Sequence, residues 1–283
     1  MLTRFAPSPT GALHLGHAYS AVLAHAAARA VGGAFRLRID DIDGSRSRAA
    51  FVTAALADLA WLGLAWDGPP LVQSQRLDAY SLALDQLRDA GLTYPCFCTR
   101  ADIAASTAAP HGPAGALYPG TCRALDPAAV AGRQATEPHC WRLDMSAAAA
   151  RAGSLGWPEQ GQGARIADPL AHGDVVLARK DAPASYHLAS TLDDAHMGVT
   201  LVVRGADLVA AADVHRLLQA LLGLPAPAYR HHALVVGPDG HRLAKRDAAA
   251  SLAGLRAQGV DGPTLAKDLA MHRLPTGYSL AMA

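Results

Sequence analysis

Lysine, aromatic residues and cysteine are scarce in this 283-residue sequence, and these shortages exclude several classes of protein. Lysine occurs only as Lys180, Lys245 and Lys267, so the basic residues are almost all arginine. Lys+Arg 25 against Asp+Glu 24 leaves a net charge of +1, which excludes a polycation held to nucleic acid by bulk charge alone. Aromatic residues make up 5% of the chain, so its alanine-rich helices should pack closely around few large side chains.

Four cysteines are too few for a disulfide framework in a chain of this length, and two of them form Cys96-Phe97-Cys98. This pattern favours a metal site in a reducing cytoplasm. The longest apolar-looking stretch, residues 18–31, is interrupted by His25 and Arg29, so we expect no membrane span. Sequence that reads as structured begins at Arg4, so we expect no signal peptide and a cytoplasmic protein.

The expected elements alternate between strand and helix. Apolar runs predict strands at residues 2–5, 35–39, 141–143, 174–179, 199–203 and 233–236. Helical spacing and glycine stop signals predict helices at 16–31, 48–62, 76–90 and 207–222, and a last helix beginning near Asp247 or Ala248. This order predicts an α/β fold with a parallel sheet and helices on both faces.

Two stretches lack this periodicity. Proline, glycine and alanine dominate between Cys96 and Cys140, where the cysteines also gather, so residues 96–140 are interpreted as an inserted subdomain. Residues 146–163 are low in complexity and are predicted to form a loop.

The segment from Arg4 to His17 carries the strongest functional pattern. Two prolines stiffen a loop that leaves the carboxyl end of a strand, where open α/β sheets bind ligands. His14 and His17 lie three apart at the start of a helix, so both rings can point to one side, and the helix-start amides add a docking place for phosphates. Gly16 removes a side chain where a flat ring could lie against the backbone. The alternatives are a metal-binding His-x-x-His and an incidental surface pair.

This segment resembles a known signature. His14-Leu15-Gly16-His17 resembles the HIGH motif of class I aminoacyl-tRNA synthetases, and the preceding RFAPSPTG resembles their glutamyl branch. Further segments resemble that branch in order: LRIDDID from Leu37, DLAWLGLAWD from Asp58, YHLA from Tyr186, the pair Asp193-Asp194, and VRGADL from Val203. The resemblance implies a Rossmann-like class I synthetase catalytic domain that uses ATP with Mg²⁺, with ATP contacted by His14, Gly16, His17 and Lys245.

The lysine comes from a second segment, Arg242-Leu243-Ala244-Lys245-Arg246, which resembles the KMSKS signature and follows a glycine-led loop at 237–240. The resemblance implies that Lys245 closes on the phosphates as pyrophosphate leaves and that it is catalytic together with His14 and His17. Ala244 departs from the usual serine, which removes one hydroxyl contact. Read alone, the segment is a solvated basic run.

The same resemblance sets the expected domain organisation. A catalytic domain would span residues 1–95 and 141–245, with an acceptor-type zinc-binding insertion at 96–140 and a short helical segment at 246–283. Only 38 residues follow Lys245 (283 minus 245), too few for an anticodon-binding domain. This short form resembles the glutamyl-Q tRNA(Asp) synthetases, which activate glutamate with ATP and attach it to queuosine in the anticodon of tRNA-Asp.

The implied partners are therefore tRNA-Asp carrying queuosine, L-glutamate and ATP, with the chain acting as a monomer. Two alternatives are a conventional enzyme that charges tRNA-Glu with a separate anticodon-binding partner, and a non-catalytic RNA-binding relic. Intact His14, His17 and Lys245 argue against the relic.

A zinc site is expected in the insertion. Cys96 and Cys98 could bind one metal, and a later cysteine could complete a tetrahedron. Spacing alone does not nominate a tyrosine, but relatives of glutamyl-tRNA synthetase use Cys-x-Cys…Tyr-x-x-x-Cys, which Tyr118 and Cys122 match. The resemblance therefore implies one structural zinc. The competing ligands are His111 and Cys140.

A glutamate pocket needs a partner for each charged group of the amino acid. Arginine pairs bidentately with carboxylates, and the resemblance nominates Arg4 and Arg204. It places Asp40, one methylene shorter than the family's glutamate, near the α-ammonium group and gives Tyr186 a hydroxyl contact; Ala6 and Ser8 complete the set. The alternative for Arg204 is an ion pair with Asp207.

Overall fold

A computed structural model describes residues 1–99, 102–103, 117–241, 243 and 251–282. Three residues singled out by the sequence, His111, Ala244 and Lys245, lie outside these ranges, as does the expected start of the last helix. In the part of the chain that the structure describes, no helix is both long enough and apolar enough to cross a membrane.

The centre of the molecule is a parallel sheet assembled from two sets of strands. Strands β1 (Leu2–Phe5), β2 (Ala34–Ile39) and β3 (Leu71–Val72) pair in parallel. Strands β9 (Leu201–Gly205) and β10 (Ala228–His232) also pair in parallel, and β6 (Gly156–Glu159) joins β10. Thr200 N donates to Leu2 O at 3.0 Å, which places β9 beside β1. The resulting order β3-β2-β1-β9-β10 is the predicted parallel α/β sheet.

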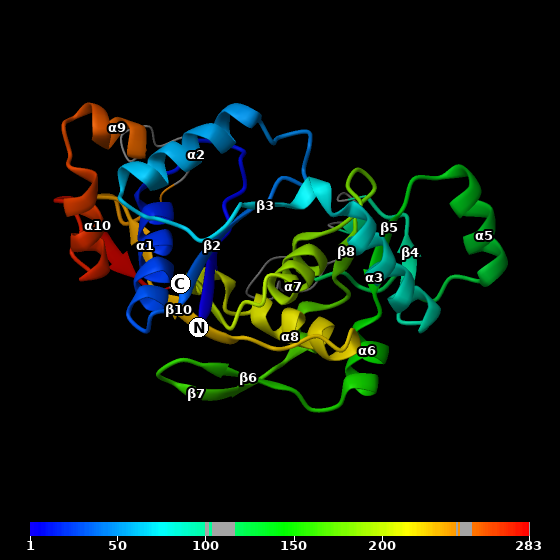
Figure 1. Ribbon diagram of the computed structural model, residues 1–283. Coiled ribbons are helices and arrows are strands. Elements are labelled where there is room, and N and C mark those ends of the chain that lie inside the picture. The colour runs from blue at the N-terminus through cyan, green and yellow to red at the C-terminus, as the bar shows by residue number, and fades with distance from the viewer. Residues whose placement is uncertain (100–101, 104–116, 242, 244–250, 283) are drawn as a thin grey trace.

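Helices cover both faces of this sheet, as predicted (Figure 1). Leu201 and Val203 pack into a core with α1 (Leu15–Arg29), α2 (Ala49–Trp61), α9 (Leu252–Ala257) and α10 (Gly262–Ala270). Between them Val202 points to the opposite face and packs with residues at α7 (Tyr186–His196) and α8 (Ala211–Leu221). Side chains alternate across a strand, so one β9 strand contributes to both cores.

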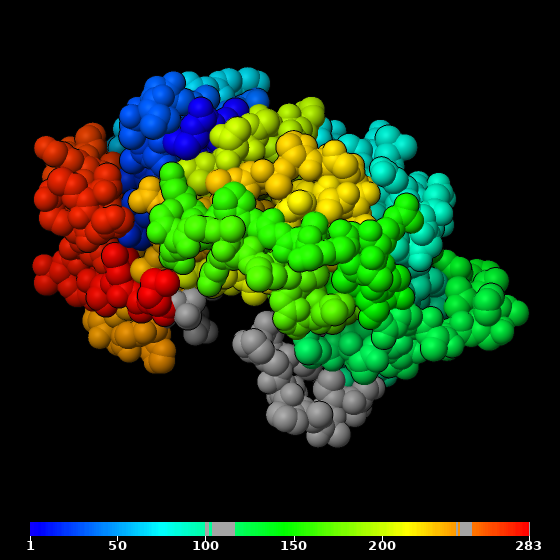
Figure 2. Space-filling model, turned by 90° about the horizontal axis from the view of Figure 1, so that it is seen from below, coloured from blue at the N-terminus to red at the C-terminus, as the bar shows by residue number. Residues whose placement is uncertain are grey.

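A second, antiparallel sheet lies beyond the central one. It contains β4 (Thr93–Cys96), β5 (Cys140–Leu143) and β8 (Val176–Ala178), and α3 (Leu77–Asp89) packs against it. Helix α5 (Pro127–Thr136) lies at this end of the molecule, and α9 and α10 lie at the other (Figures 1 and 2). Near α10, β11 (Leu234–Val236) pairs antiparallel with β12 (Ser279–Ala281).

The expected loop at residues 146–163 is wrong. This stretch contains most of α6 (Met145–Ala152), all of β6 and the start of β7 (Gly163–Ile166). Asp144 caps α6 through a hydrogen bond from Ala147 N at 3.1 Å, and β6 alternates buried and exposed residues. Short alanine- and glycine-rich elements carry too weak a pattern to be found by periodicity.

One helix was not predicted, and another begins later than predicted. Helix α5 occupies part of the insertion where no periodicity was found, and it begins at a capping Asp126 followed by Pro127. The expected helix at 207–222 is a 3₁₀ turn (Ala206–Leu208) followed by α8, which begins at Ala211.

Candidate active site

The loop between β1 and α1 is held against the end of β2, because Asp40 N donates to Pro7 O at 3.1 Å. Helix α1 then begins with His14 as its N-cap residue. Nδ1 of His14 accepts from Gly16 N at 3.2 Å, and Nδ1 of His17 accepts from His14 N at 3.2 Å. The two ring centroids are 3.8 Å apart, so the rings lie together, as their spacing predicts.

Gly16 lets the His14 ring lie close to the backbone. A Cβ at this position would lie 3.1 Å from Cε1 of His14, so the ring would have to shift to make room for it. The flat ring that lies against the glycine backbone is therefore the first histidine of the motif itself.

A pocket opens at the carboxyl ends of β1, β2 and β9, next to the start of α1. Of the ten residues that the sequence nominated for glutamate and ATP, Ser8 lines a neighbouring hollow and Lys245 lies outside the described residues. The other eight line the pocket: Arg4, Ala6, His14, Gly16, His17, Asp40, Tyr186 and Arg204.

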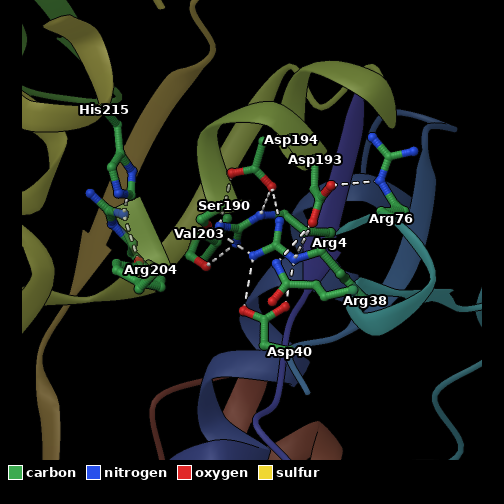
Figure 3. A network of polar contacts seen from close by, with 12 residues as sticks. Arg4, Arg38, Asp40, Arg76, Ser190, Asp193, Asp194, Val203, Arg204 and His215 are labelled. Atoms are coloured by element: carbon green, nitrogen blue, oxygen red, sulfur yellow. Dashed lines mark hydrogen bonds and ion pairs between the residues drawn. The ribbon is translucent and has the colours of Figure 1, made fainter. Parts of the chain in front are cut away.

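A buried ion network forms one wall of this pocket (Figure 3). The Asp194 carboxylate on α7 accepts hydrogen bonds from Arg4 Nε at 2.9 Å, Arg4 Nη2 at 3.2 Å and Arg38 Nη1 at 2.6 Å. Arg38 also holds Asp40 with Nε at 2.6 Å and Nη2 at 3.1 Å, and Nη2 reaches Ser190 at 2.9 Å. Arg38 is 1% exposed, which makes it a central support of the site.

Asp193, the residue that precedes Asp194 on α7, also accepts several buried hydrogen bonds. Asp193 is fully buried and accepts from Arg76 Nε at 2.7 Å. It also accepts from Gln73 and Tyr80, each at 2.8 Å. Burial and the Asp193 carboxylate both raise the pKa of the Tyr80 hydroxyl, so Tyr80 stays a donor.

The network balances its own charge, since three arginines (Arg4, Arg38, Arg76) face three aspartates (Asp40, Asp193, Asp194). Burial alone would raise the pKa of Asp194, but Arg4 and Arg38 outweigh it and hold that pKa below its usual value. For Asp40, burial dominates and raises the pKa despite Arg38. This wall therefore supplies shape and hydrogen bonds more than net charge.

Arg204 differs from these arginines, because none of its described partners is a carboxylate. It is 4% exposed, Nε lies 3.1 Å from His231 Nε2, and Nη1 lies 3.3 Å from both the Tyr186 hydroxyl and His215 Nδ1. Nη2 is buried without a hydrogen-bond partner in the described part of the chain. The alternative ion pair with Asp207 is not formed between these two described residues. Arg204 is thus a buried cation at the pocket that forms no ion pair with a described carboxylate, although it lies close enough to Asp194 to help lower the pKa of that residue. It is suited to an incoming carboxylate.

Described residues on both sides of Lys245 lie close to this pocket. Leu243 lines it, and Ser251 forms a β-bridge with His14. Leu252 N donates to Leu13 O at 2.9 Å, which holds the start of α9 against the residues that precede α1.

Three cysteines gather where the insertion leaves β4. The Sγ atoms of Cys96, Cys98 and Cys122 all lie within 4.8 Å of one another, and the last two are 3.5 Å apart. Sulfurs around a tetrahedral zinc ion are roughly 3.8 Å apart, given Zn–S bonds of about 2.3 Å. The Tyr118 oxygen lies 3.8 Å from Cys98 Sγ and accepts Cys122 N–H at 2.8 Å. The donor set is compatible with zinc.

Cys140 stands beside this group without joining it. It pairs with Cys96 across β4 and β5, and a hydrogen bond from its thiol lowers the pKa of Cys96 to about 4. The guanidinium of Arg142 lies 3.8 Å from the centre of the Tyr118 ring, which places a cation next to the sulfurs. The other competing ligand, His111, lies outside the described residues.

A larger hollow connects the two sites. It shares Asp40 and Tyr186 with the first pocket and extends to Cys98 and Tyr118. Ser8 lines this hollow, together with the basic side chains Arg46, Arg179 and Lys180. Asp43 and Asp181 also line it and form ion pairs with the two arginines.

The sequence alone indicates no role for Arg38, Asp194, His215 or His231. In the sequence, Arg38 is a polar position in a strand of alternating apolar and polar residues. Asp194 is part of the pair Asp193-Asp194, which resembles the family but carries no stated role. Arg38 and Asp194 are 156 residues apart in the chain, so no local spacing indicates their contact.

Comparisons with known proteins identify the family of this chain. The chain matches the family model of the class I tRNA synthetase (E and Q) catalytic domain over residues 1–274. It is 49% identical over 271 residues to a glutamyl-Q tRNA(Asp) synthetase of Rhodobacter capsulatus, covering 92% of this chain and 96% of that one. A protein of the same name from Symbiobacterium thermophilum is 45% identical, covering 94% of this chain and 84% of that one.

Among solved structures, a glutamate tRNA ligase from Elizabethkingia meningosepticum in complex with its amino acid is similar, with a TM-score of 0.79. The two are 26% identical, and the match covers 96% of this chain and 60% of that chain. The chain therefore spans about three fifths of the length of that ligase.

Proposed function

We propose that this chain, which belongs to the glutamyl-Q tRNA(Asp) synthetases of the class I synthetase family, activates L-glutamate with ATP and transfers it to queuosine in the anticodon of tRNA-Asp. The observation that carries the choice of amino acid is Arg204, a buried cation without a described carboxylate partner at the pocket. A second negative charge distinguishes glutamate from most amino acids, and a guanidinium is the side chain best suited to bind it.

In this proposal the side-chain carboxylate of glutamate binds to Arg204, with the Tyr186 hydroxyl beside it. Arg4 contributes Nη1, whose described contact is a long 3.5 Å approach to Val203 O, because its other nitrogens bind Asp194. Asp40 lies on the same pocket and takes the α-ammonium group while Arg38 holds its carboxylate in place. Ala6 leaves room in the pocket wall, and Ser8 belongs to the adjoining hollow.

ATP would bind across the start of α1 and contact His14, Gly16 and His17 there, and Lys245 would contact its phosphates. The α-carboxylate of glutamate attacks the α-phosphorus, pyrophosphate leaves, and glutamyl-adenylate forms. Mg²⁺ bound to ATP would neutralise phosphate charge. Positioning and charge stabilisation suffice for this step, so no covalent protein nucleophile is required. The flanks of the Lys245 segment support its role, since Leu243 and Ser251 both lie beside the site.

Transfer would use the hollow next to the pocket. A hydroxyl of queuosine attacks the activated carbonyl carbon, an ester forms and AMP leaves. The hollow supports this step because it joins the pocket at Asp40 and Tyr186. It also carries the basic side chains Arg46, Arg179 and Lys180, of which Arg46 and Arg179 form ion pairs with Asp43 and Asp181 of the same hollow. Basic side chains suit the phosphates of an RNA loop.

We further propose one structural zinc held by Cys96, Cys98, Tyr118 and Cys122. The metal would supply no reaction chemistry; it would fix the insertion at the edge of the hollow. The domains would then follow the expected boundaries, with the catalytic part at 1–95 and 141–245, the insertion at 96–140 and the C-terminal segment at 246–283. The chain would act as a monomer in the cytoplasm.

Two assays test this function. Glutamate-dependent exchange of pyrophosphate into ATP tests activation of glutamate. The absence of exchange would support the alternative that the protein binds RNA without catalysing a reaction. Transfer of labelled glutamate is then compared on tRNA-Asp with and without queuosine and on tRNA-Glu. We expect label only on queuosine-containing tRNA-Asp, retained when the terminal adenosine is removed. Label on tRNA-Glu that is lost with the terminal adenosine would instead identify a conventional charging enzyme.

A further inference from the structure

Arg204 is held in place by neutral groups. Its Nε faces His231 Nε2 at 3.1 Å, and its Nη1 faces the Tyr186 hydroxyl and His215 Nδ1, both at 3.3 Å. Arg4 and Arg38, by contrast, bind carboxylates directly. Neutral acceptors fix the direction of a guanidinium without cancelling its charge, whereas a carboxylate does both.

The His231 ring can play this part only in one tautomer. Nε2 must accept from Arg204, so the proton must lie on Nδ1. Nδ1 lies 2.7 Å from Glu159 Oε2, and the other oxygen, Oε1, accepts the backbone N–H of His231 at 2.7 Å. A carboxylate oxygen can only accept, so Oε2 binds a donating Nδ1 and fixes the proton there.

Glu159 and His231 are well placed to stay in this state. Glu159 is 3% exposed and lies on β6, opposite Tyr229 of β10. The charged groups around His231 are Glu159, Arg204 and Arg165, and the rings of Trp157 and Tyr229 pack against it. Burial, assisted by Arg204, lowers the pKa of His231 to about 4, so the ring is neutral at neutral pH.

We propose that Glu159 and His231 are positioning residues for glutamate recognition: Glu159 fixes the tautomer of His231, and His231 Nε2 orients Arg204 while leaving its charge available to the substrate carboxylate. This inference rests on the proposed function and adds the residues that make Arg204 selective. Neither residue is among the described residues that line the pocket, so their effect on glutamate must pass through Arg204.

The tautomer requirement gives a sharp test with Glu159→Gln. A glutamine keeps the size of the side chain but offers one acceptor oxygen and one amide donor. If the oxygen keeps the backbone N–H, the amide donates to His231 Nδ1, the proton moves to Nε2, and two donors then face each other at Arg204. His231→Leu removes the acceptor altogether, and His231→Gln can restore an acceptor oxygen near the position of Nε2.

The experiment measures amino-acid-dependent pyrophosphate exchange for the full chain and these three variants, with KM determined separately for glutamate and ATP. We expect Glu159→Gln and His231→Leu to raise KM for glutamate about 10-fold or more and to narrow the preference for glutamate over glutamine. KM for ATP should stay within about 2-fold, and His231→Gln should recover part of the loss.

Trp157→Phe serves as the matched control. Trp157 lies on β6, is buried, packs against His231 of β10 and donates a hydrogen bond to Asp213 at 2.8 Å. Replacing the Trp157 ring therefore disturbs the same region without removing a hydrogen bond to Arg204. It should lower thermal stability and leave the preference for glutamate unchanged. If His231→Leu fails to fold, Glu159→Gln and His231→Gln decide the question through the same KM values.

The outcomes separate this inference from the proposed function. If no amino acid supports pyrophosphate exchange by the wild-type chain, both the proposed function and the positioning role are overturned. Suppose instead that the wild-type chain is active with glutamate and that the Glu159→Gln and His231→Leu variants fold. If KM for glutamate and the preference for glutamate over glutamine are then unchanged in both variants, only the positioning role is overturned. The positioning role is likewise overturned if Trp157→Phe alters selectivity as much as those two variants do.

Discussion

Replacing Arg204 with leucine should strongly weaken glutamate activation while the protein still folds. Arg204 is 4% exposed, but its described partners are two imidazoles and a hydroxyl. Its removal leaves neutral acceptors without a donor, at a cost of about 1–3 kcal/mol in the free energy of unfolding. Removing Arg38 instead would leave the buried Asp40 carboxylate without its described ion-pair partner and Asp194 with Arg4 alone, a loss of about 3–5 kcal/mol for a broken buried pair. Arg204→Leu should therefore still fold.

The hydrogen bonds that glutamate loses involve charged groups on both sides. A hydrogen bond to a charged group contributes roughly 1.5–3 kcal/mol, so kcat/KM for glutamate should fall about 10- to 150-fold. Glutamine carries no charge on its side chain and loses less, so the ratio of the two activities should shrink by a similar factor. Asp40→Asn is the matched comparison, because it should weaken both amino acids alike through the shared α-ammonium group.

The assay is pyrophosphate exchange with each amino acid, run beside thermal unfolding of both variants. If Arg204→Leu folds and keeps the wild-type ratio of glutamate to glutamine activity, the side-chain carboxylate does not bind at Arg204. The absence of a described carboxylate partner for Arg204 would then not explain the choice of substrate. Arg4 would be the remaining nominated arginine that could bind the side-chain carboxylate of glutamate.

Three further predictions address the rest of the site. Lys245→Ala should lower adenylate formation by about 10²–10³-fold while glutamate still protects the protein against heat; near-normal exchange would contradict its role. Cys98→Ser should release zinc and loosen the insertion with little change in KM for ATP, and metal analysis that finds no zinc in the folded wild type would refute the ligand set. Asp194→Asn should lower the free energy of unfolding by about 3–5 kcal/mol at neutral pH. Since the folded pKa of Asp194 lies below its unfolded value of about 3.9, the wild type should lose this advantage as pH falls through that region, and urea unfolding at several pH values measures it.

The parts of the fold that were predictable are those encoded by neighbours in the chain. The β1–α1 unit follows from a short apolar run, two prolines and an alanine-rich helix, and its histidines meet because they are three residues apart. The network around Arg38 was not predictable in this way. Its contact with Asp194 depends on α7 folding over the end of β2, which no local periodicity encodes.

The case of Arg204 shows why a nearby opposite charge is weak evidence for an ion pair. Asp207 is three residues away and is the nearest carboxylate that follows it in sequence. Arg204, however, lies in a strand and Asp207 in the 3₁₀ turn that follows, so the spacing that joins residues i and i+3 on a helix does not apply. The guanidinium instead meets His231 on the adjacent strand β10 and two side chains from α7 and α8.

The wrongly predicted loop matters for function for the same reason. Residues 146–163 include Glu159, and its carboxylate reaches His231 only because β6 adds to the edge of β10 and faces it inward. Were this stretch a solvated loop, a glutamate there would be exposed and could not fix a tautomer against competition from water. Burial at 3% exposure makes its two hydrogen bonds to His231 strong enough to do so. A short strand with almost no sequence signal thereby connects the edge of the sheet to the arginine that we propose selects the substrate.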